Sequence, residues 1–320
     1  MAGPGSPKKI VYSKHYRVDI GDHVFPTSKY DRIRERLADE RSSPPLRFVS
    51  PQPARDKDIL LTHTAEYFDK LKTGRLTREE ILRMELPYSR ELVESSLICC
   101  GGTILASQIA LEDGLGIHIG GGFHHAFPDH GEGFCVLNDI AVAIKLLKKR
   151  RIIRRALVID CDLHQGNGTA ATFAGNKEVF TFSIHQENNY PFIKPASSLD
   201  IGLHDMTGDK EYCGILSDTV PKIISDFKPQ FIVYAAGADP FREDQIGGLA
   251  LSKEGLKRRD EIIFTQAINY QVPIAVVLAG GYAYDQEDTV DIHCATILTG
   301  LKMFFENPVS QKPRIRKGNH

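Results

Sequence analysis

Residues 156–169 read ALVIDCDLHQGNGT, and this stretch decides the fold class. Its first four residues are apolar, include two β-branched side chains and are too few for a helix, so they predict a buried parallel strand. Asp160, Asp162 and His164 follow directly. Unpaired charge that is buried at the end of a strand costs several kcal/mol. The stretch therefore predicts a strand whose carboxyl end faces a positively charged partner.

Three more short apolar segments, at 116–119, 231–235 and 273–278, have the same character. Amphipathic stretches alternate with them, at 89–112, 138–149, 209–227 and 252–270, and several begin at a Ser, Asn or Asp that can cap a helix. This alternation predicts a three-layer α/β fold, with a mainly parallel central sheet and helices on both faces. The 320 residues show no internal repeat, so we expect one domain over residues 1–320.

The composition argues against several classes of protein. The 40 Lys and Arg residues nearly balance the 41 Asp and Glu residues, which argues against direct binding of nucleic acid. The apolar runs are too short to span a bilayer, and residues 1–6 are small and rich in Gly and Pro, unlike an export signal. The six cysteines form no C-x-x-C pair, so we expect reduced thiols. Together these features predict a cytoplasmic protein without a membrane partner.

Each of the predicted strands ends in residues that can do chemistry. His124 and His125 follow a triple glycine after the first strand, Asp239 follows the third, and residues 280–282 (GGY) follow the fourth. In open α/β sheets, ligands bind outside the carboxyl ends of the strands. We therefore expect these residues to meet the acids and the histidine of the second strand in one pocket.

Asp162, His164 and Asp239 are candidate metal ligands. Two carboxylates and one imidazole leave a coordination position open, which a catalytic zinc site requires. The alternative is that the acids cap the following helix or bind an arginine. Beside such a Lewis acid, His124 and His125 would supply a general base and a general acid; the alternative for them is a structural role.

Aromatic residues complete the predicted site. The glycines before Tyr282 would let the chain bend so that the phenol donates a hydrogen bond to a developing oxyanion, and the alternative is an ordinary core tyrosine. Gly133, Phe134 and Tyr190 would line a narrow apolar channel or belong to the core. The glycine-rich segments fit neither pattern of a phosphate-binding loop, which argues against nucleotide binding.

The chain resembles the histone deacetylase family of metal-dependent deacylases in five motifs. These are GGGFHHA (120–126), GFC (133–135), DCDLHQGNGT (160–169), GAD (237–239) and GGY (280–282). Their order and approximate spacing match from about His23 to the last strand, and GGTI (101–104) with the short chain is most similar to the class IV branch. The resemblance implies an arginase-like fold, one zinc ion or an iron(II) ion in its place, and a structural potassium ion.

The resemblance also implies a role for each motif residue. Asp162, His164 and Asp239 take the zinc-ligand positions, and Tyr282 takes the position that polarises the acyl carbonyl. His125 matches the general acid/base, His124 the electrostatic histidine, Asp160 the acid that orients His124, and Asn167 the partner of His125. Phe134 and Tyr190, beside Gly133, would hold the acyl-lysine stem, and potassium would bind the backbone of Asp160, Asp162 and His164 together with Ser183.

Three positions depart from the family pattern. Many relatives have an aspartate where Asn167 stands, and an amide cannot stabilise a charged imidazole as a carboxylate does. We therefore expect His125 to be the more easily deprotonated histidine of the pair. Lys29 falls near the arginine that some relatives place in a product-exit channel. Glu85 is a poor match for the aspartate that grips the substrate backbone at the rim.

These observations predict hydrolysis of N-acyl-lysine amides in a protein or peptide, by a deacetylase or a fatty deacylase. Two alternatives are open at this point: a hydrolase of small acylated amines such as acetylpolyamines, and a non-catalytic binder of acyl-lysine. Competent residues at every implied ligand position and at Tyr282 favour an enzyme over a binder.

Overall fold

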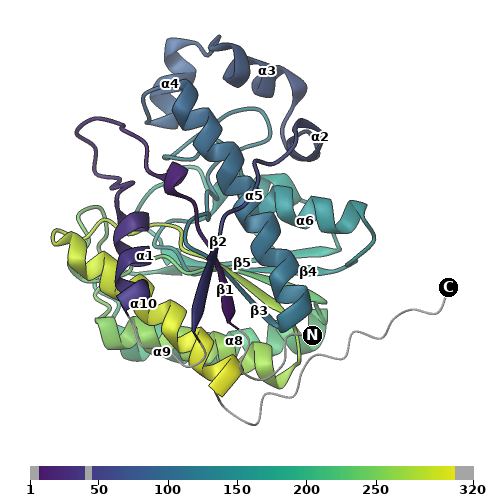
Figure 1. Cartoon of the computed structure of the whole chain (residues 1–320). Helices are drawn as coiled ribbons and strands as arrows, with labels where there is room; N and C mark the ends of the chain where they lie inside the picture. Colours follow the sequence, from purple (N-terminus) through teal and green to yellow (C-terminus); the bar gives the residue numbers. More distant parts are fainter. Residues whose placement is uncertain (1–6, 40–44, 307–320) are drawn as a thin grey trace.

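An eight-stranded sheet forms the central layer of the molecule (Figure 1). The computed structural model describes residues 7–39 and 45–306; residues 1–6, in which we predicted no export signal, and the outer ends of the predicted domain lie outside this part. The strand order is β2-β1-β3-β8-β7-β4-β5-β6, and all neighbouring pairs are parallel. The strands are β1 (Lys8–Val11), β2 (Leu46–Val49), β3 (Leu115–His118), β4 (Ala156–Asp160), β5 (Val179–Gln186), β6 (Leu199–Leu203), β7 (Phe231–Ala235) and β8 (Ile274–Val277).

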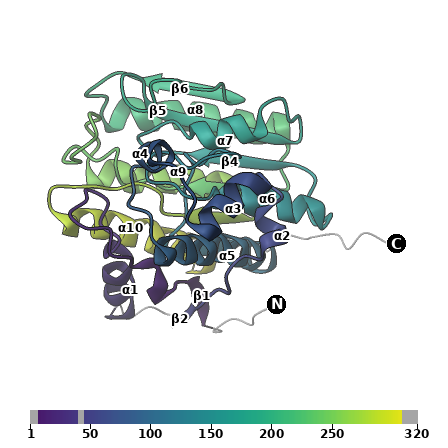
Figure 2. The same cartoon turned by 90° about the horizontal axis from the view of Figure 1, so that it is seen from above.

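Helices cover both faces of the sheet, as predicted. They are α1 (Lys29–Asp39), α2 (Asp56–Ile59), α3 (Ala65–Thr73), α4 (Arg78–Met84), α5 (Arg90–Asp113), α6 (Asp139–Lys149), α7 (Asn167–Phe173), α8 (Asp209–Phe227), α9 (Lys253–Asn269) and α10 (Gln286–Leu301), with a 3-10 turn η1 (Lys14–Tyr16) and a π-helical turn η2 (Lys302–Glu306). Figure 2 shows β5 and β6 at one edge of the sheet and β1 and β2 at the opposite edge.

Alternate residues of the central strands belong to two different cores. Ala156 and Val158 of β4 lie in a core with residues of α5, α6 and α7. Leu157 and Ile159 lie in the larger core, which includes residues of α8, α9 and α10. Because successive side chains of a strand point to opposite faces, an unbroken apolar run is what a strand covered on both faces requires.

The four predicted strands are the central neighbours β3, β8, β7 and β4, each within one residue of its predicted bounds. Their last residues are level in the sheet: His118 pairs with Val277, Val277 with Ala235, and Ala235 with Asp160. The segments that follow these strands therefore start side by side at the carboxyl ends of the central strands, which confirms the predicted convergence.

The four predicted helices correspond to α5, α6, α8 and α9, and three of them begin as the sequence indicated. Ser89, Asn138 and Ser252 each accept a hydrogen bond from a backbone N–H of the first turn of their helix. The prediction of an Asp cap for the fourth helix is wrong, because Gly208 occupies the N-cap of α8 and the Asp209 carboxylate accepts hydrogen bonds from Ser252 instead.

Helix α5 is the one helix in the described part of the chain that is long and apolar enough to cross a membrane. No unbroken apolar run in the sequence reveals this helix, because Ser, Gly, Thr and Gln interrupt its apolar residues. However, 67% of its most apolar window is buried inside the protein, where it packs against β3 and α6. Such burial is typical of a core helix. Helix α5 packs against β3, the strand that leads into the triple glycine.

A buried histidine beside α5 predicts acid sensitivity of the fold. His118 contacts Thr103 Oγ1 at 3.0 Å and Tyr16 Oη at 2.7 Å, and burial lowers its pKa to about 3. Because the pKa in the folded state lies below that of the unfolded chain, His118 costs stability as pH falls below about 6.5. We expect His118→Gln to reduce the difference in unfolding free energy between pH 7 and pH 5 by about 2 kcal/mol, measured by urea denaturation. An unchanged difference would contradict this account.

Candidate active site

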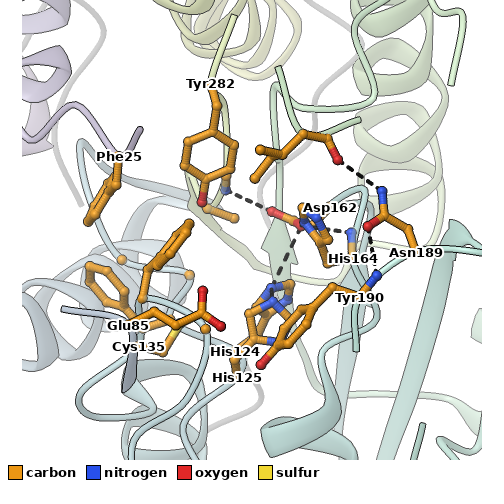
Figure 3. A pocket seen from close by; sticks show the side chains of 18 of the residues that line it. Phe25, Glu85, His124, His125, Cys135, Asp162, His164, Asn189, Tyr190 and Tyr282 are labelled. Carbon is orange, nitrogen blue, oxygen red and sulfur yellow. Dashed lines mark hydrogen bonds and ion pairs between the residues drawn. The ribbon is translucent and has the colours of Figure 1, made fainter. Parts of the chain in front are cut away.

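A cavity of about 220 Å³ opens at the level carboxyl ends of the four central strands (Figure 3). All of its walls come from loops and from segments that are distant in the sequence. The lining residues are Phe25, Tyr30, Glu85, Gly121, Gly122, Phe123, His124, His125, Gly133, Phe134, Cys135, Asp162, His164, Asn189, Tyr190, Ile246, Ala279, Gly280 and Tyr282. The cavity thus brings together predicted residues from the ends of β3, β4 and β8, and Asp239, after β7, lies beside Asp162 and His164 without lining the cavity.

The triple glycine lets the loop after β3 lie against the loop after β8. Gly120, Gly121 and Gly122 all have positive φ, and a Cβ atom on Gly122 would lie 2.6 Å from Cα of Ala279. The carboxylate of Asp139, at the start of α6, accepts hydrogen bonds from the N–H groups of Gly122 and Phe123. These contacts fix the backbone that presents the two histidines.

Asp162, His164 and Asp239 form a compact, buried group whose candidate ligand atoms all lie within 4.8 Å of one another. Asp162 Oδ2 accepts the N–H of Gly280 at 2.7 Å, and Asp239 Oδ1 accepts the N–H of Leu163 at 3.0 Å. These bonds tie the loops after β4, β7 and β8 together. The remaining oxygen, Asp239 Oδ2, is buried and has no hydrogen-bond partner among the described residues.

The charges of this group fit a bound cation. Burial, and then the charge of Asp162, raise the pKa of Asp239 to about 6. Burial alone would lower the pKa of His164, but its contacts with Asp162 and Asp239 outweigh burial and raise it to about 10. Two carboxylates and an imidazole match the donor set of a zinc site that has an open position. Asp239 Oδ2, which has no hydrogen bond among the described residues, lies 3.4 Å from His164 Nδ1. Among the described residues, the carboxylates of Asp162 and Asp239 contact His164 and the N–H groups of Gly280, His164 and Leu163, and neither an arginine nor the first turn of α7, so the helix-cap and arginine alternatives find no support.

The two histidines differ in environment. His124 Nδ1 lies 2.7 Å from Asp160 Oδ2, whereas His125 Nδ1 lies 2.7 Å from Asn167 Oδ1, and the two Nε2 atoms are 3.1 Å apart. Burial lowers the pKa of His124, but the charges of Asp160 and Asp162 prevail and raise it to about 9. Burial, followed by the charge of His124, holds the pKa of His125 well below its usual value.

His125 is therefore the more easily deprotonated histidine, in the predicted direction. The main cause differs from the predicted one, because burial and neighbouring positive charge count for more than the amide at position 167. At neutral pH the pair consists of a charged His124 and a neutral His125, which is the arrangement that a general base needs.

Tyr282 and Phe134 line the cavity together. Their ring centroids are 5.8 Å apart, and Phe25 lies 6.3 Å from each of them. The N–H of Tyr282 donates to Asp244 Oδ2 at 2.7 Å, and burial raises the pKa of its phenol well above the usual value. Tyr282 is thus a protonated donor whose ring is held by aromatic contacts.

Tyr190 stands beside the histidines, with its ring centroid 5.0 Å from that of His125 and 6.1 Å from that of His164. Gly133, where φ is 51°, contacts the same tyrosine so closely that a Cβ atom would lie 2.9 Å from its ring. Of the two interpretations of Phe134 and Tyr190, core or channel wall, the structure supports the wall.

Two of the three positions that depart from the family pattern, Lys29 and Glu85, lie behind or beside this cavity. Lys29 is fully buried behind Tyr282, its Nζ donates to the carbonyl of Ala279 at 2.9 Å, and burial lowers its pKa to about 8. Glu85 lines the cavity with its carboxylate directed inward in Figure 3. Its φ of 58° places it at the C-cap of α4. Ser183 pairs with Asp160 across β5 and β4, next to the predicted potassium position.

Several residues of the site carried no sequence signal. Arg259 of α9 is fully buried, and its Nη1 donates to the carbonyl of Gly237 at 2.5 Å, behind the loop that carries Asp239. Glu132 accepts hydrogen bonds from Asn167 and Tyr190. A single charged residue in a helix or loop resembles a solvated one in sequence, and only the fold shows these contacts.

The chain is similar in sequence and in structure to known deacetylases. A histone deacetylase domain matches residues 23–297. Histone deacetylase 2 of Arabidopsis thaliana is 31% identical over 295 residues, which cover 87% of this chain and 76% of that protein. A probable deacetylase of Methanothermobacter thermautotrophicus is 31% identical over 287 residues, which cover 85% of both chains. The solved HDA15 HD domain aligns with a TM-score of 0.73 at 21% identity, over 93% of this chain and 96% of that one.

The structural likeness establishes the arginase/deacetylase-like α/β fold, and the sequence matches establish the family. The names of these relatives state no class, so the similarity to the class IV branch stays a prediction. The chain belongs to the histone deacetylase family.

Proposed function

We propose that this protein is a zinc-dependent hydrolase of N-acyl-lysine amides. One observation carries the proposal: Asp162 and His164 line one cavity with the histidine pair and Tyr282, and Asp239 completes the metal-ligand group beside them, in a chain of the deacetylase family. When bound to Asp162, His164 and Asp239, zinc supplies Lewis-acid polarisation of the acyl carbonyl and lowers the pKa of a water molecule. Iron(II) is the alternative ion for the same donors.

The chain's own residues then account for each proton. His125 is neutral, so it takes a proton from the attacking water and later donates it to the leaving amine nitrogen. Charged His124, paired with Asp160, stabilises negative charge without giving up its proton. The Tyr282 phenol donates a hydrogen bond to the carbonyl oxygen as it becomes an oxyanion. Water and amide are thereby converted to a carboxylate and a protonated amine, because the second proton of the water also ends on the amine nitrogen.

Further residues support binding. Phe134 and Tyr190 line the cavity and provide apolar walls for the methylene stem of a lysine. For the structural potassium ion, we propose the backbone of Asp160, Asp162 and His164 with Ser183, which the sheet register places beside Asp160. This ion would fix the loop that carries two of the zinc ligands.

The hydrolysis of small acylated amines is the second candidate. Glu85 favours it, because it lines the cavity and its carboxylate, which points into the pocket in Figure 3, has no hydrogen-bond partner among the described residues. A free carboxylate there would attract the positive charge of a polyamine. No comparable observation favours a non-catalytic binder.

A substrate series tests these proposals. We expect turnover of peptides with acetyl-, octanoyl- or myristoyl-lysine that stops when a hydroxamate chelator is added, and the preferred chain length separates a deacetylase from a fatty deacylase. Turnover of N-acetylpolyamines alone would instead support the second candidate. Stoichiometric zinc without turnover of any of these substrates would contradict both and favour a binder.

A further inference from the structure

Glu132 connects two parts of the site that the proposed mechanism treats separately. It lies in the turn before Phe134, where Glu132 and Cys135 exchange two backbone hydrogen bonds, of 3.0 and 2.9 Å. The turn is also held to the end of α4, because Phe134 N–H donates to the carbonyl of Met84 at 3.0 Å. The backbone that carries this carboxylate is therefore well fixed.

The first contact of Glu132 determines which way an amide points. Asn167 Nδ2 donates to Glu132 Oε1 at 2.6 Å, and the N–H of Gly168 donates to Asn167 Oδ1 at 3.0 Å. The two ends of an amide have nearly the same shape, so only their hydrogen-bond partners distinguish them. An ionised carboxylate accepts but cannot donate, so Glu132 requires the NH₂ end on its side.

The direction of the amide determines the tautomer of His125. With Nδ2 on Glu132, Asn167 Oδ1 faces His125 Nδ1 at 2.7 Å, and this nitrogen must therefore carry the proton. Neutral imidazole then has its lone pair on Nε2, which lies 3.1 Å from His124 Nε2 in the wall of the cavity. The charged His124 can donate to this lone pair in the resting site, and the same nitrogen is the one that takes up a proton when His125 acts as a base.

The second contact joins the channel wall to the same carboxylate oxygen. Tyr190 Oη donates to Glu132 Oε1 at 2.8 Å, and the Tyr190 ring lies edge-on to the ring of His125. The other oxygen, Oε2, lies 3.3 Å from His130 Nε2. Burial alone would raise the pKa of Glu132, but the hydrogen bonds from His130, Tyr190 and Asn167 outweigh burial and lower it. The carboxylate is therefore ionised and accepts hydrogen bonds at neutral pH.

We propose that Glu132 is a positioning residue that holds His125 in its Nδ1–H tautomer, through Asn167, and anchors the Tyr190 wall beside it. This inference rests on the proposed function in one respect, the role of His125 as general base. The hydrogen-bond relations among these side chains stand independently of any substrate.

The decisive test compares the effect of Glu132→Ala in the native chain with its effect in the Asn167→Asp variant. We expect Glu132→Ala to lower kcat about 10- to 100-fold in the native background, as the loss of an orienting partner does at other sites. An aspartate at 167 accepts the Nδ1 proton of His125 in either orientation of its carboxylate. However, its negative charge would be repelled by the adjacent Glu132 carboxylate. In Asn167→Asp, the further change Glu132→Ala is therefore expected to raise kcat. A packing role alone would lower kcat in both backgrounds, which would overturn the proposal.

A second measurement does not depend on activity or on a substrate. In protein labelled with ¹⁵N at histidine, we expect the His125 ring shifts of the native chain and of Asn167→Asp to report Nδ1–H, and those of Glu132→Ala to report mixed tautomers. Glu132→Gln keeps the accepting oxygen and should retain the native shifts. The matched control Tyr190→Phe removes only the wall contact and should change KM more than kcat. Native His125 shifts in Glu132→Ala would overturn the proposal, whether or not the protein hydrolyses acyl-lysine.

Discussion

Asp239→Asn is expected to abolish zinc binding and to lower kcat/KM by more than the roughly 10- to 100-fold that the loss of an outer-shell partner costs. The substitution keeps size and shape, and its carbonyl oxygen can still accept from Leu163, as Asp239 Oδ1 does at 3.0 Å. It replaces Oδ2, which has no hydrogen bond among the described residues and lies 3.4 Å from His164 Nδ1, with an NH₂ group that has no lone pair to give to a metal.

The same variant should be more stable than the native protein when neither holds metal. Burial, and then the charge of Asp162, raise the pKa of Asp239 to about 6, which is above its value in the unfolded chain. A carboxyl group with a raised pKa costs stability once pH exceeds that of the unfolded group, and the full cost is present above pH 6. Without metal, Asp239→Asn should therefore melt at a higher temperature at pH 7.5, and this advantage should disappear toward pH 4.

Three measurements test this prediction together: zinc content after dialysis, the melting temperature with and without added zinc, and kcat/KM. Added zinc should raise the unfolding free energy of the native protein, by about 2.7 kcal/mol when free zinc is 100 times its dissociation constant, and should leave that of Asp239→Asn unchanged. Phe134→Ala is the matched control, because it lines the cavity without a ligand atom and should retain zinc. Equal losses of activity in the two variants, or stoichiometric zinc in Asp239→Asn, would refute the ligand assignment.

The part of the fold that could be predicted from sequence is the part that is buried on both faces. β3, β4, β7 and β8 are continuous apolar runs because helices cover both of their sides. The outer strands lack this signal. β2 and β6 are largely half-buried and mix polar with apolar residues, and β5 buries Thr181, Ser183 and His185 among its apolar residues.

The predicted site shows the same division. The residues at the strand ends converge because the sheet register places those ends side by side, which a parallel fold requires. Phe25, Glu85 and Asn189 come instead from loops whose paths depend on packing with distant segments, and no periodicity describes such paths. Glu132 directly precedes the predicted Gly133 and Phe134, yet its importance arises from two partners, 35 and 58 residues away.

Tyr282→Phe is expected to lower kcat about 10²- to 10³-fold, the usual cost of losing one oxyanion donor, with little change in KM. The hydroxyl has no hydrogen-bond partner among the described residues, so its donor is available to a substrate, and the raised pKa keeps that donor protonated. Phenylalanine retains the ring contacts with Phe25 and Phe134. The shape of the cavity that binds the substrate is therefore kept, and only the hydrogen-bond donor is lost.

The metal group does not include Tyr282, and this separates the two large effects. Tyr282→Phe should retain stoichiometric zinc and the gain in melting temperature that zinc provides, whereas Asp239→Asn should lose both. Steady-state kinetics on one acyl-lysine peptide, with zinc content measured on the same samples, tests the distinction. If Tyr282→Phe kept more than about a tenth of the native kcat, the loss would be smaller than one oxyanion donor supplies, and the carbonyl oxygen would have to be stabilised without the phenol.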